Sequence, residues 1–230
     1  MTALQFLAID APSNIELLQG LNPSESDFVL EAARTRQVPA KSMMTRQGEP
    51  AEYLLLLWRG RARYFYETHD GKKLLLKWII PGCIFGGAAL VSGAAKYLVS
   101  TETVRDSIVL EWDRSTIRGL ARRFPRLLEN AHRTDMDYVS WYVATHAALT
   151  SQNARKRLAS VLFGLTRCVG QKVSGGIEIE VTNEELADSA NISPYTISRL
   201  ISEWQKAGAV RKSRGKILLR SPERLLLRAV

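Results

Sequence analysis

The chain has 230 residues, of which 46% are hydrophobic and 24% charged, so it is long enough for one large or two ordinary domains with hydrophobic cores. No apolar run approaches the length of a membrane span, and the first residues lack the basic start of a signal peptide, so we expect a soluble cytoplasmic protein. The two cysteines, Cys83 and Cys168, are too few for a disulfide framework, a zinc site or an iron-sulfur cluster.

The formal charge of +9 is concentrated in the last third of the chain. Residues 151–230 carry 14 Lys and Arg against 7 Asp and Glu, whereas residues 1–150 carry 18 against 16. Such an excess suits contact with a polyanion, most plausibly nucleic acid, because phosphate contacts supply sequence-independent affinity. A solvated basic surface explains the charge equally well, so the motifs have to decide.

The first third of the chain predicts short helices and then a β domain. Residues 13–37 have helical patterning, in which Asn22 is a cap and Pro23 fits the first helical position. From residue 38 to about 112, short strand-like runs alternate with turn signals, which is typical of a closed or sandwiched antiparallel β domain. Within this region His69-Asp70-Gly71 supplies the turn of a hairpin over residues 61–80.

After Trp112 the pattern becomes helical, and the run from about Pro125 to Cys168 predicts a long helix with one apolar seam. The seam residues recur at helical spacing: Met136, Val139, Tyr142, Val143 and His146. Two interpretations stay open, because this seam can pack on the β domain of its own chain or form the contact of a parallel dimer. We favour the dimer.

Two short helices joined by a tight turn follow in residues 181–210. Thr182 and Glu185 form a capping box at the start of the first helix, Asn183 to Ala190. Ser193 is the N-cap of the second helix, and Pro194 takes its first position, where the missing N–H costs nothing. The apolar face of the pair is formed by Leu186, Ala187, Ile192, Ile197, Leu200, Ile201 and Trp204.

The opposite face of the second helix carries short polar groups, one aromatic ring and one arginine: Tyr195, Thr196, Ser198, Arg199 and Ser202. Such a surface suits a DNA major groove. The hairpin pattern that follows has a basic tip with Arg211, Lys212, Arg214 and Lys216, which suits phosphate contacts. The segment therefore predicts a winged helix-turn-helix that binds double-stranded DNA.

Four stretches resemble, in order and spacing, the Crp-Fnr family of bacterial transcription regulators: "RQGEPAEYLLLLWRGRARYF", "DGKKLLLKWIIPGCIFGG", "ARKRLASVLFGL" and "TNEELADSANISPYTISRLISEWQKAGAV". The resemblance covers nearly the whole chain. It implies an α+β protein with an N-terminal β-roll (a double-stranded β-helix), a long dimerisation helix and a C-terminal winged helix-turn-helix. The expected boundaries are residues 1–120 for the β-roll, 121–152 for the dimerisation helix and 153–230 for the DNA-binding domain.

The resemblance also implies a homodimer that binds a palindromic promoter site and acts on RNA polymerase. Cyclic-nucleotide-binding members hold the ribose with the glutamate of a Gly-Glu pair and the cyclic phosphate with the arginine of a later Arg-Ser pair. Here the matching positions are Gly86-Gly87 and Tyr97-Leu98. Lys96 offers a point charge but no bidentate fork, and the nucleobase contacts align with Tyr142 and Val143. We therefore expect an effector pocket around Gly86, Gly87, Lys96 and Tyr142, and an effector other than cyclic AMP.

Other cofactors and functions find less support in the sequence. A haem-sensing regulator of the same fold needs an axial ligand, for which His69, His132, His146 and Cys83 are the candidates, and none is assigned. A cupin-type metalloenzyme needs two or more His with a carboxylate, and the β region has His69 alone, so we expect no enzyme and no metal. A ligand-binding module acting on a protein partner is a further alternative, and the basic wing argues against it.

Overall fold

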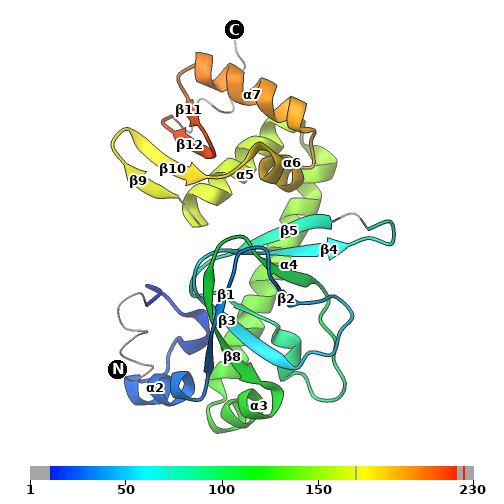
Figure 1. The fold of residues 1–230 in the computed structure, drawn as a ribbon, viewed down its shortest axis with the longest axis vertical. Helices are drawn as coiled ribbons and strands as arrows, with labels where there is room; N and C mark the ends of the chain where they lie inside the picture. The colour runs from blue at the N-terminus through cyan, green and yellow to red at the C-terminus, as the bar shows by residue number, and fades with distance from the viewer. Residues whose placement is uncertain (1–10, 72, 169, 222–224, 226–230) are drawn as a thin grey trace. The chain divides into compact units, whose positions relative to one another are not determined.

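The computed structural model describes residues 11–71, 73–168, 170–221 and 225. Contacts within the chain divide it into two compact units, unit 1 (Met1–Trp141) and unit 2 (Tyr142–Val230). The long helix α4 (Arg126–Ser151) contributes residues to both (Figure 1). Among the described residues, no helix has the length and hydropathy of a membrane span.

Unit 1 begins with the short helix η1 (Glu16–Leu18) and helix α2 (Pro23–Glu31). The predicted cap is confirmed, since the backbone N–H of Glu25 donates to the Asn22 side chain and the N–H of Asn22 donates to the Glu25 carboxylate, both at 2.9 Å. The helical prediction was wrong at its end. Residues Arg34–Val38 form strand β1, because pairing with the distant strand β8 overrides the local pattern.

Eight strands of unit 1 form two four-stranded sheets, with strand orders β1-β8-β3-β6 and β2-β7-β4-β5. After β1 these strands are β2 (Met43–Thr45), β3 (Tyr53–Arg59), β4 (Ala62–Glu67), β5 (Lys73–Ile79), β6 (Ile84–Phe85), β7 (Ser100–Thr103) and β8 (Ser107–Asp113). Their pairings are antiparallel. The β-roll is therefore confirmed, as is the β4–β5 hairpin with Gly71 at φ 77° in its turn.

Strand β3 is buried over five consecutive residues because both faces of its sheet are covered. Leu54 and Leu56 belong to a core that contains residues of α2, of α3 (Arg114–Arg123) and of the start of α4. Leu55 and Leu57 belong to a second core, with residues of the other sheet such as Ala62. Because successive side chains of β3 point to opposite faces, one face of the strand packs against the other sheet and the opposite face packs against the helices.

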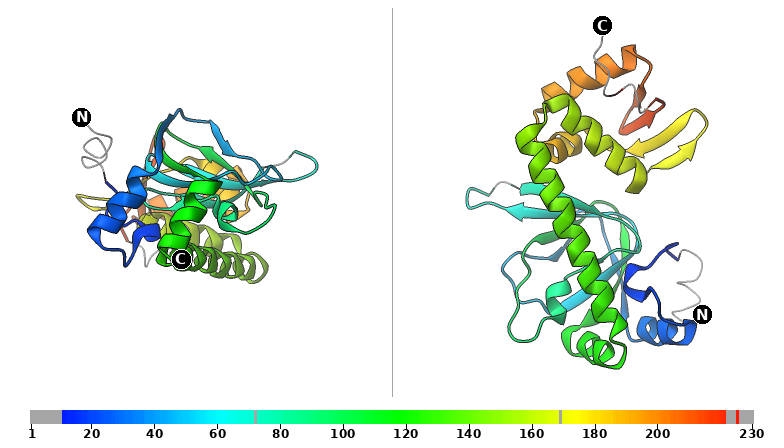
Figure 2. Two further views of the ribbon diagram at one scale, coloured as in Figure 1. Left: turned by 90° about the horizontal axis from the view of Figure 1, so that it is seen from below. Right: turned by 180° about the vertical axis from the view of Figure 1, so that it is seen from behind.

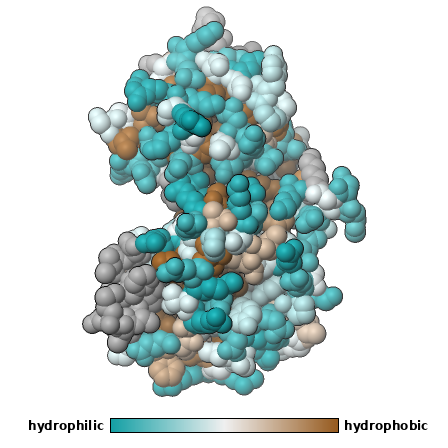
Figure 3. All heavy atoms as spheres, viewed as in Figure 1, coloured by the Kyte–Doolittle hydropathy of each residue, from teal (hydrophilic) through white to brown (hydrophobic). Residues whose placement is uncertain are grey.

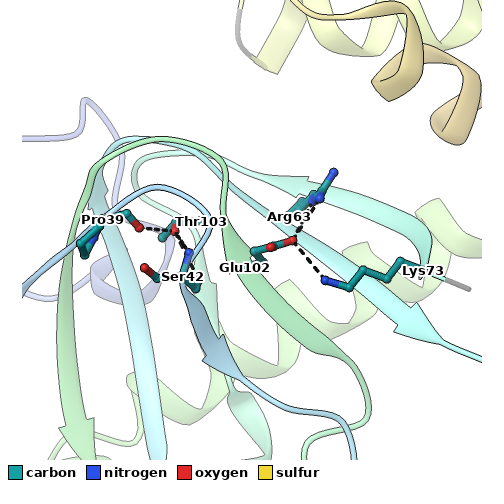
Figure 4. A network of polar contacts seen from close by, with 6 residues as sticks. All are labelled: Pro39, Ser42, Arg63, Lys73, Glu102 and Thr103. Carbon is teal, nitrogen blue, oxygen red and sulfur yellow. Dashed lines mark hydrogen bonds and ion pairs between the residues drawn. The ribbon is translucent and has the colours of Figure 1, made fainter. Parts of the chain in front are cut away.

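Polar side chains connect the strands of the second sheet, β2-β7-β4-β5, as Figure 4 shows. The backbone N–H of Ser42 donates to the Thr103 hydroxyl at 2.9 Å, and that hydroxyl donates to the carbonyl of Pro39 at 2.6 Å. The Glu102 carboxylate lies between Arg63, at 3.0 Å, and Lys73, at 3.8 Å. These contacts join β7 to the segment before β2 and to the β4–β5 hairpin.

The helical run from Pro125 to Cys168 forms two helices, so the prediction of one long helix was wrong. Helix α4 ends at Ser151, and α5 (Ala154–Cys168) begins after Asn153, whose side chain accepts from the N–H of Lys156 at 3.0 Å. A local cap of this kind starts a new helix without a proline. Figure 2 shows the first part of α4 alongside the strands of unit 1.

Unit 2 contains α5, α6 (Asn183–Ala190), α7 (Pro194–Lys206) and a sheet with strand order β11-β12-β10-β9. Its strands are β9 (Gln171–Val173), β10 (Gly176–Glu180), β11 (Val210–Ser213) and β12 (Lys216–Leu219). The predicted apolar residues Ile197, Leu200 and Trp204 of α7 are at most 2% exposed. The winged helix-turn-helix is confirmed, with β11 and β12 as the wing and β9–β10 as an additional hairpin.

Candidate nucleic-acid interface and β-roll cavity

The two helices of the helix-turn-helix begin where the caps predict. The N–H of Glu185 donates to the Thr182 hydroxyl at 3.2 Å, and the N–H of Thr182 donates to the Glu185 carboxylate at 2.8 Å. At the start of α7 the N–H of Thr196 donates to the Ser193 hydroxyl at 3.1 Å, with Pro194 in the first helical position. The caps fix the first turn of α7, which carries the candidate reading residues.

The turn between α6 and α7 depends on Asn191, which sequence analysis did not single out. Asn191 ends α6 in the left-handed conformation, with φ 48° and ψ 56°. The N–H of the next residue, Ile192, then donates to the carbonyl of Ala187 at 3.1 Å. Asparagine is one of the few side chains that tolerate this conformation, so its position after a capped helix was a usable signal.

The predicted reading residues of α7 lie on one exposed face of the helix. Tyr195 is 79% exposed, and Ser198, Arg199 and Ser202 are also exposed. Thr196 is half-buried, and its hydroxyl lies 2.9 Å from that of the capping Ser193. The face therefore presents an aromatic ring, hydroxyls and a guanidinium, which are groups that recognise base edges and phosphates.

Asn183, at the start of α6, connects the reading face to the wing. Its side-chain amide donates to the hydroxyl of Ser198 at 3.0 Å, and its carbonyl oxygen accepts from the Lys212 ammonium at 2.7 Å. The residue thus fixes two predicted DNA contacts that are 14 positions apart in the sequence. Sequence analysis missed this role because nothing local distinguishes Asn183 from any other first-turn residue.

Arg199 is held within unit 2 by a carboxylate on its own helix. Its Nη1 atom lies 2.6 Å from Oε1 of Glu203, one turn later on α7. The other oxygen of Glu203 forms an ion pair with Arg155 of α5. The i, i+4 spacing of Arg199 and Glu203 was visible in the sequence, whereas the part played by Arg155 depends on packing.

The wing carries the other predicted phosphate contacts. Arg211 lies on β11 and Arg214 in the turn, and both are exposed. Lys216, at the start of β12, forms an ion pair with Glu178 of β10 at 2.6 Å. The structure thus brings the four wing cations together in one hairpin, and the role of each in DNA contact stays a prediction.

Helix α4 exposes most of the predicted apolar seam. Met136, Val139, Tyr142 and Val143 are each about half exposed or more, and His146 is exposed beside them. By contrast, Figure 3 shows a face on which hydrophilic residues predominate and hydrophobic ones form small separate areas. A contiguous apolar row on one helix is therefore a candidate interaction surface.

Unit 1 encloses a cavity of about 150 Å³ between the β-roll and the first half of α4. Its walls carry the aromatic residues Tyr64, Trp78, Phe85, Tyr97 and Tyr138 and the charged residues Glu16, Lys77 and Asp135. The rings of Tyr64 and Tyr138 meet edge to face at 5.9 Å between centroids. Tyr138 therefore brings α4 against the strand that carries Tyr64.

Titratable groups of both signs line the cavity, with Lys77 beside Glu16 and Asp135. Partial burial raises the pKa of the Asp135 carboxyl, and the neighbouring His132 opposes that shift. Burial, together with the nearby Tyr138 and Asp135, raises the pKa of the Tyr64 phenol well above its ordinary value. Both groups therefore favour their protonated, neutral forms more than they would in water.

The predicted pocket residues are divided by the structure. Gly86 and Gly87 line the cavity, as do Tyr97 and Leu98, the positions of the family's phosphate clamp. Lys96 and Tyr142 are not among the lining residues. On α4 the lining positions are Thr134, Asp135 and Tyr138, so the helical face toward the cavity lies at least one turn earlier than the predicted Tyr142.

No group of three or more His, Cys, Asp and Glu suited to a metal ion occurs among the described residues. His69 is exposed in the β4–β5 turn, and His132 and His146 are exposed on α4. Cys83 lines the cavity, and the side chain of Cys168 lies outside the described residues. The haem candidates are thus spread over separate places, and haem stays untested.

Comparison with known families gives two matches. Residues 35–124 match the Cyclic nucleotide-binding domain, and residues 156–228 match the Crp-like helix-turn-helix domain. Among curated proteins, the Cyclic AMP receptor protein of Thermus thermophilus is 27% identical over 89% of this chain and 92% of its own length.

Solved structures resemble the chain in fold. FixK2 from Bradyrhizobium japonicum has a TM-score of 0.73 at 21% identity and covers 84% of this chain and 95% of its own. The c-di-GMP responsive regulator CLP of Xanthomonas campestris has a TM-score of 0.74 at 18% identity and covers 86% and 99%. The similarity therefore includes the β-roll and the winged helix-turn-helix.

Proposed function

This chain belongs to the Crp-Fnr family of transcription regulators, and on that premise we propose that it is a homodimer that binds a two-fold symmetric promoter site. We further propose that it acts on RNA polymerase and that its β-roll responds to a signal other than cyclic AMP. The observation that carries the proposal is the capped recognition helix α7, whose exposed polar face adjoins a basic wing.

Sequence-specific binding is supported by the distribution of groups in unit 2. Arg199 and Ser198 on α7 suit base edges, while Arg211 and Arg214 on the wing suit phosphates. A good bidentate arginine–guanine pair contributes about 1–3 kcal/mol of discrimination against other bases. The ring of Tyr195, 79% exposed in the first turn, suits a thymine methyl or the sugar-phosphate backbone.

Dimerisation is supported by the apolar row on α4. Val143 is 60% exposed and Tyr142 51% exposed in the single chain, and burying such side chains against a second copy is favourable by about 25 cal/mol per Å² of apolar surface. A symmetric dimer would place its two recognition helices in successive major grooves, about 34 Å apart.

A signal other than cyclic AMP is supported by the cavity. Its volume of about 150 Å³ is below the roughly 300–1,000 Å³ that ligand pockets commonly have. The resemblance matches Gly87 and Tyr97 to the glutamate and arginine of nucleotide-binding members, so the groups that hold ribose and phosphate are replaced. The names of the two relatives also differ in effector, cyclic AMP and c-di-GMP, so the fold does not fix one.

The decisive test is a binding selection from random duplexes with the full chain, with and without cyclic AMP. We expect a palindromic site in both arms, and sequence-independent binding in both would refute the proposal. Native mass spectrometry of the same preparation should give the dimer mass and report any small molecule that co-purifies.

Tyr195→Ala should change base preference at one position per half-site if the ring reads a base, and weaken all sequences alike if it contacts the backbone.

A further inference from the structure

We propose that Glu203 is a specificity-determining residue, which with Arg155 holds the Arg199 guanidinium in the orientation that reads a base. The inference rests on the proposed reading role of α7. It assigns a function to a carboxylate on a surface that is otherwise expected to meet phosphates.

The geometry around Glu203 is that of a carboxylate shared by two arginines. Its Oε1 atom lies 2.6 Å from Nη1 of Arg199, and its Oε2 atom forms an ion pair with Nη2 of Arg155. Glu203 and Arg155 are 28% and 20% exposed, against 54% for Arg199. Of the three side chains, Arg199 is therefore the one that extends furthest into solvent, and its Nε and Nη2 donors stay available for a base edge.

The far side of the arrangement is anchored in the core of unit 2. The Arg155 guanidinium lies 5.8 Å from the ring centroid of Trp204. Trp204 is 1% exposed, and its indole N–H donates to the carbonyl of Leu225 at 3.1 Å. A buried tryptophan thus positions Arg155, Arg155 positions Glu203, and Glu203 positions Arg199.

An isolated i, i+4 pair on a helix surface would not suffice for this role, because such pairs contribute only about 0.3–0.5 kcal/mol. Arg155 adds a second restraint, because its ion pair with Glu203 holds the carboxylate in place before Arg199 binds it. A guanidinium that is already oriented loses less side-chain entropy when it meets a base. It also gains discrimination, because a base that presents no acceptor at that point leaves the fork unpaired.

The carboxylate has a second effect, on binding to any duplex. Its negative charge near the phosphates opposes sequence-independent binding, which is driven by counterion release. Replacing Glu203 by the isosteric glutamine removes the charge and both ion pairs. We therefore expect Glu203→Gln to bind random duplexes more tightly and to discriminate among them less.

The experiment selects sites from random duplexes with wild type, Glu203→Gln and the control Glu178→Gln in parallel. The control also removes one carboxylate partner from a cation of unit 2, in this case Lys216 of the wing. Both variants should show higher affinity for a scrambled duplex and a steeper salt dependence, by about one unit of the log–log slope. Only Glu203→Gln should relax preference at one base position per half-site, by about fivefold or more.

The arms separate the possible failures. If wild type selects no motif, the proposed function itself fails. If wild type selects a motif and Glu203→Gln keeps the same preference at every position, the role of Glu203 is refuted. If both glutamine variants relax preference equally, the effect is one of net charge and the inference also fails.

Two further variants test the arrangement should Glu203→Gln lower the melting temperature of the full chain. Arg155→Gln leaves the Arg199–Glu203 pair in place, and we expect a smaller relaxation at the same base position. In the double variant Arg199→Gln/Glu203→Gln, preference at that position should equal that of Arg199→Gln alone. An additional loss in the double variant would show that Glu203 acts independently of Arg199 and would overturn the proposal.

Discussion

The reading face of α7 and the cavity of the β-roll are organised by different kinds of contact. On α7, the cap Ser193 fixes the first turn, and neighbours in unit 2 hold Arg199 and Ser198 in place. In the cavity, Gly87 and Tyr97 stand at the positions that the resemblance matches to the glutamate and arginine of the clamp, and both line the cavity. The reading face is thus held by polar contacts within unit 2, whereas the cavity is lined mostly by aromatic and apolar side chains.

The difference indicates which part of the protein is constrained by shape and which by chemistry. A helix-turn-helix has to present its residues at a fixed geometry to a duplex whose dimensions do not vary. A sensor cavity can change its ligand by replacing a few side chains while the strands around it stay in place. Substitutions in the two regions should therefore differ in kind and in size.

The largest effect is expected where the cavity wall depends on a glycine. Gly86 has φ 79°, and a Cβ there would lie 2.5 Å from the backbone carbonyl oxygen of Tyr53. The left-handed conformation costs about 1–2 kcal/mol for a residue with a Cβ, and the overlap adds about 1–3 kcal/mol. Gly86→Ala should therefore lower the free energy of unfolding by about 2–5 kcal/mol, measured by urea denaturation of the full chain.

Gly48→Ala is the matched control, because Gly48 has φ 82° and no atom within 4 Å of the added Cβ. Only the conformational cost of about 1–2 kcal/mol applies there. Equal losses in the two variants would mean that the backbone around Gly86 moves to accommodate the added Cβ. The backbone of the cavity wall would then be less rigid than its close approach to Tyr53 indicates.

The next effect concerns the first turn of the recognition helix. Ser193→Ala removes the hydroxyl that accepts from the N–H of Thr196, and loss of such a cap costs about 1 kcal/mol. Ser202→Ala, on the exposed face of the same helix, should change stability by less than about 0.5 kcal/mol. Thermal unfolding of both variants measures the difference in stability. Similar melting temperatures would show that the Ser193 cap does not stabilise α7.

A smaller effect is expected from the contact between the reading face and the wing. Asn183→Ala removes the partner of Ser198 and of Lys212 without changing the charge. Lys212 would then have to be oriented when it meets a phosphate, which should weaken DNA binding by about 1 kcal/mol, measured by titration of the selected duplex. The salt dependence should stay the same because the number of cations is the same; a shallower slope would show that Lys212 no longer reaches the DNA.

Most of the reading face could be predicted from the sequence because it follows from local rules. A capping residue, a proline at the first helical position and the 3.6-residue period fix where α6 and α7 begin and which side of each is buried. The break between α4 and α5 does not follow from the helical period, since the run from Pro125 to Cys168 contains no interior proline, although Asn153 is a local signal for it.

The cavity could not be predicted in the same way. Its walls come from Glu16 of η1, Tyr64 of β4 and Asp135 of α4, which are brought together only by the fold. The resemblance indicated Gly86 and Gly87, which line the cavity, whereas Thr134, Asp135 and Tyr138 of α4 line it without having been indicated by any motif. Strands β1, β2 and β6 were missed for a related reason, since short strands are defined by their partners.

The smallest effect is a pH dependence that distinguishes the cavity face of α4 from the solvent face. Partial burial raises the pKa of Asp135, with His132 opposing, so the folded protein holds this proton more tightly than the unfolded chain. The contribution of Asp135 to stability is therefore most favourable below the ordinary carboxyl pKa and is lost as pH rises through the higher folded value.

Asp135→Asn cannot ionise, so its melting temperature should exceed that of wild type by a small amount at pH 7, and the two should converge toward pH 4. Asp137→Asn, which removes a carboxylate of the same helix that is not among the residues lining the cavity, is the matched control. If Asp135→Asn followed wild type at every pH, the carboxylate would be fully hydrated. The wall of the cavity at Asp135 would then be as well solvated as the outer face of α4.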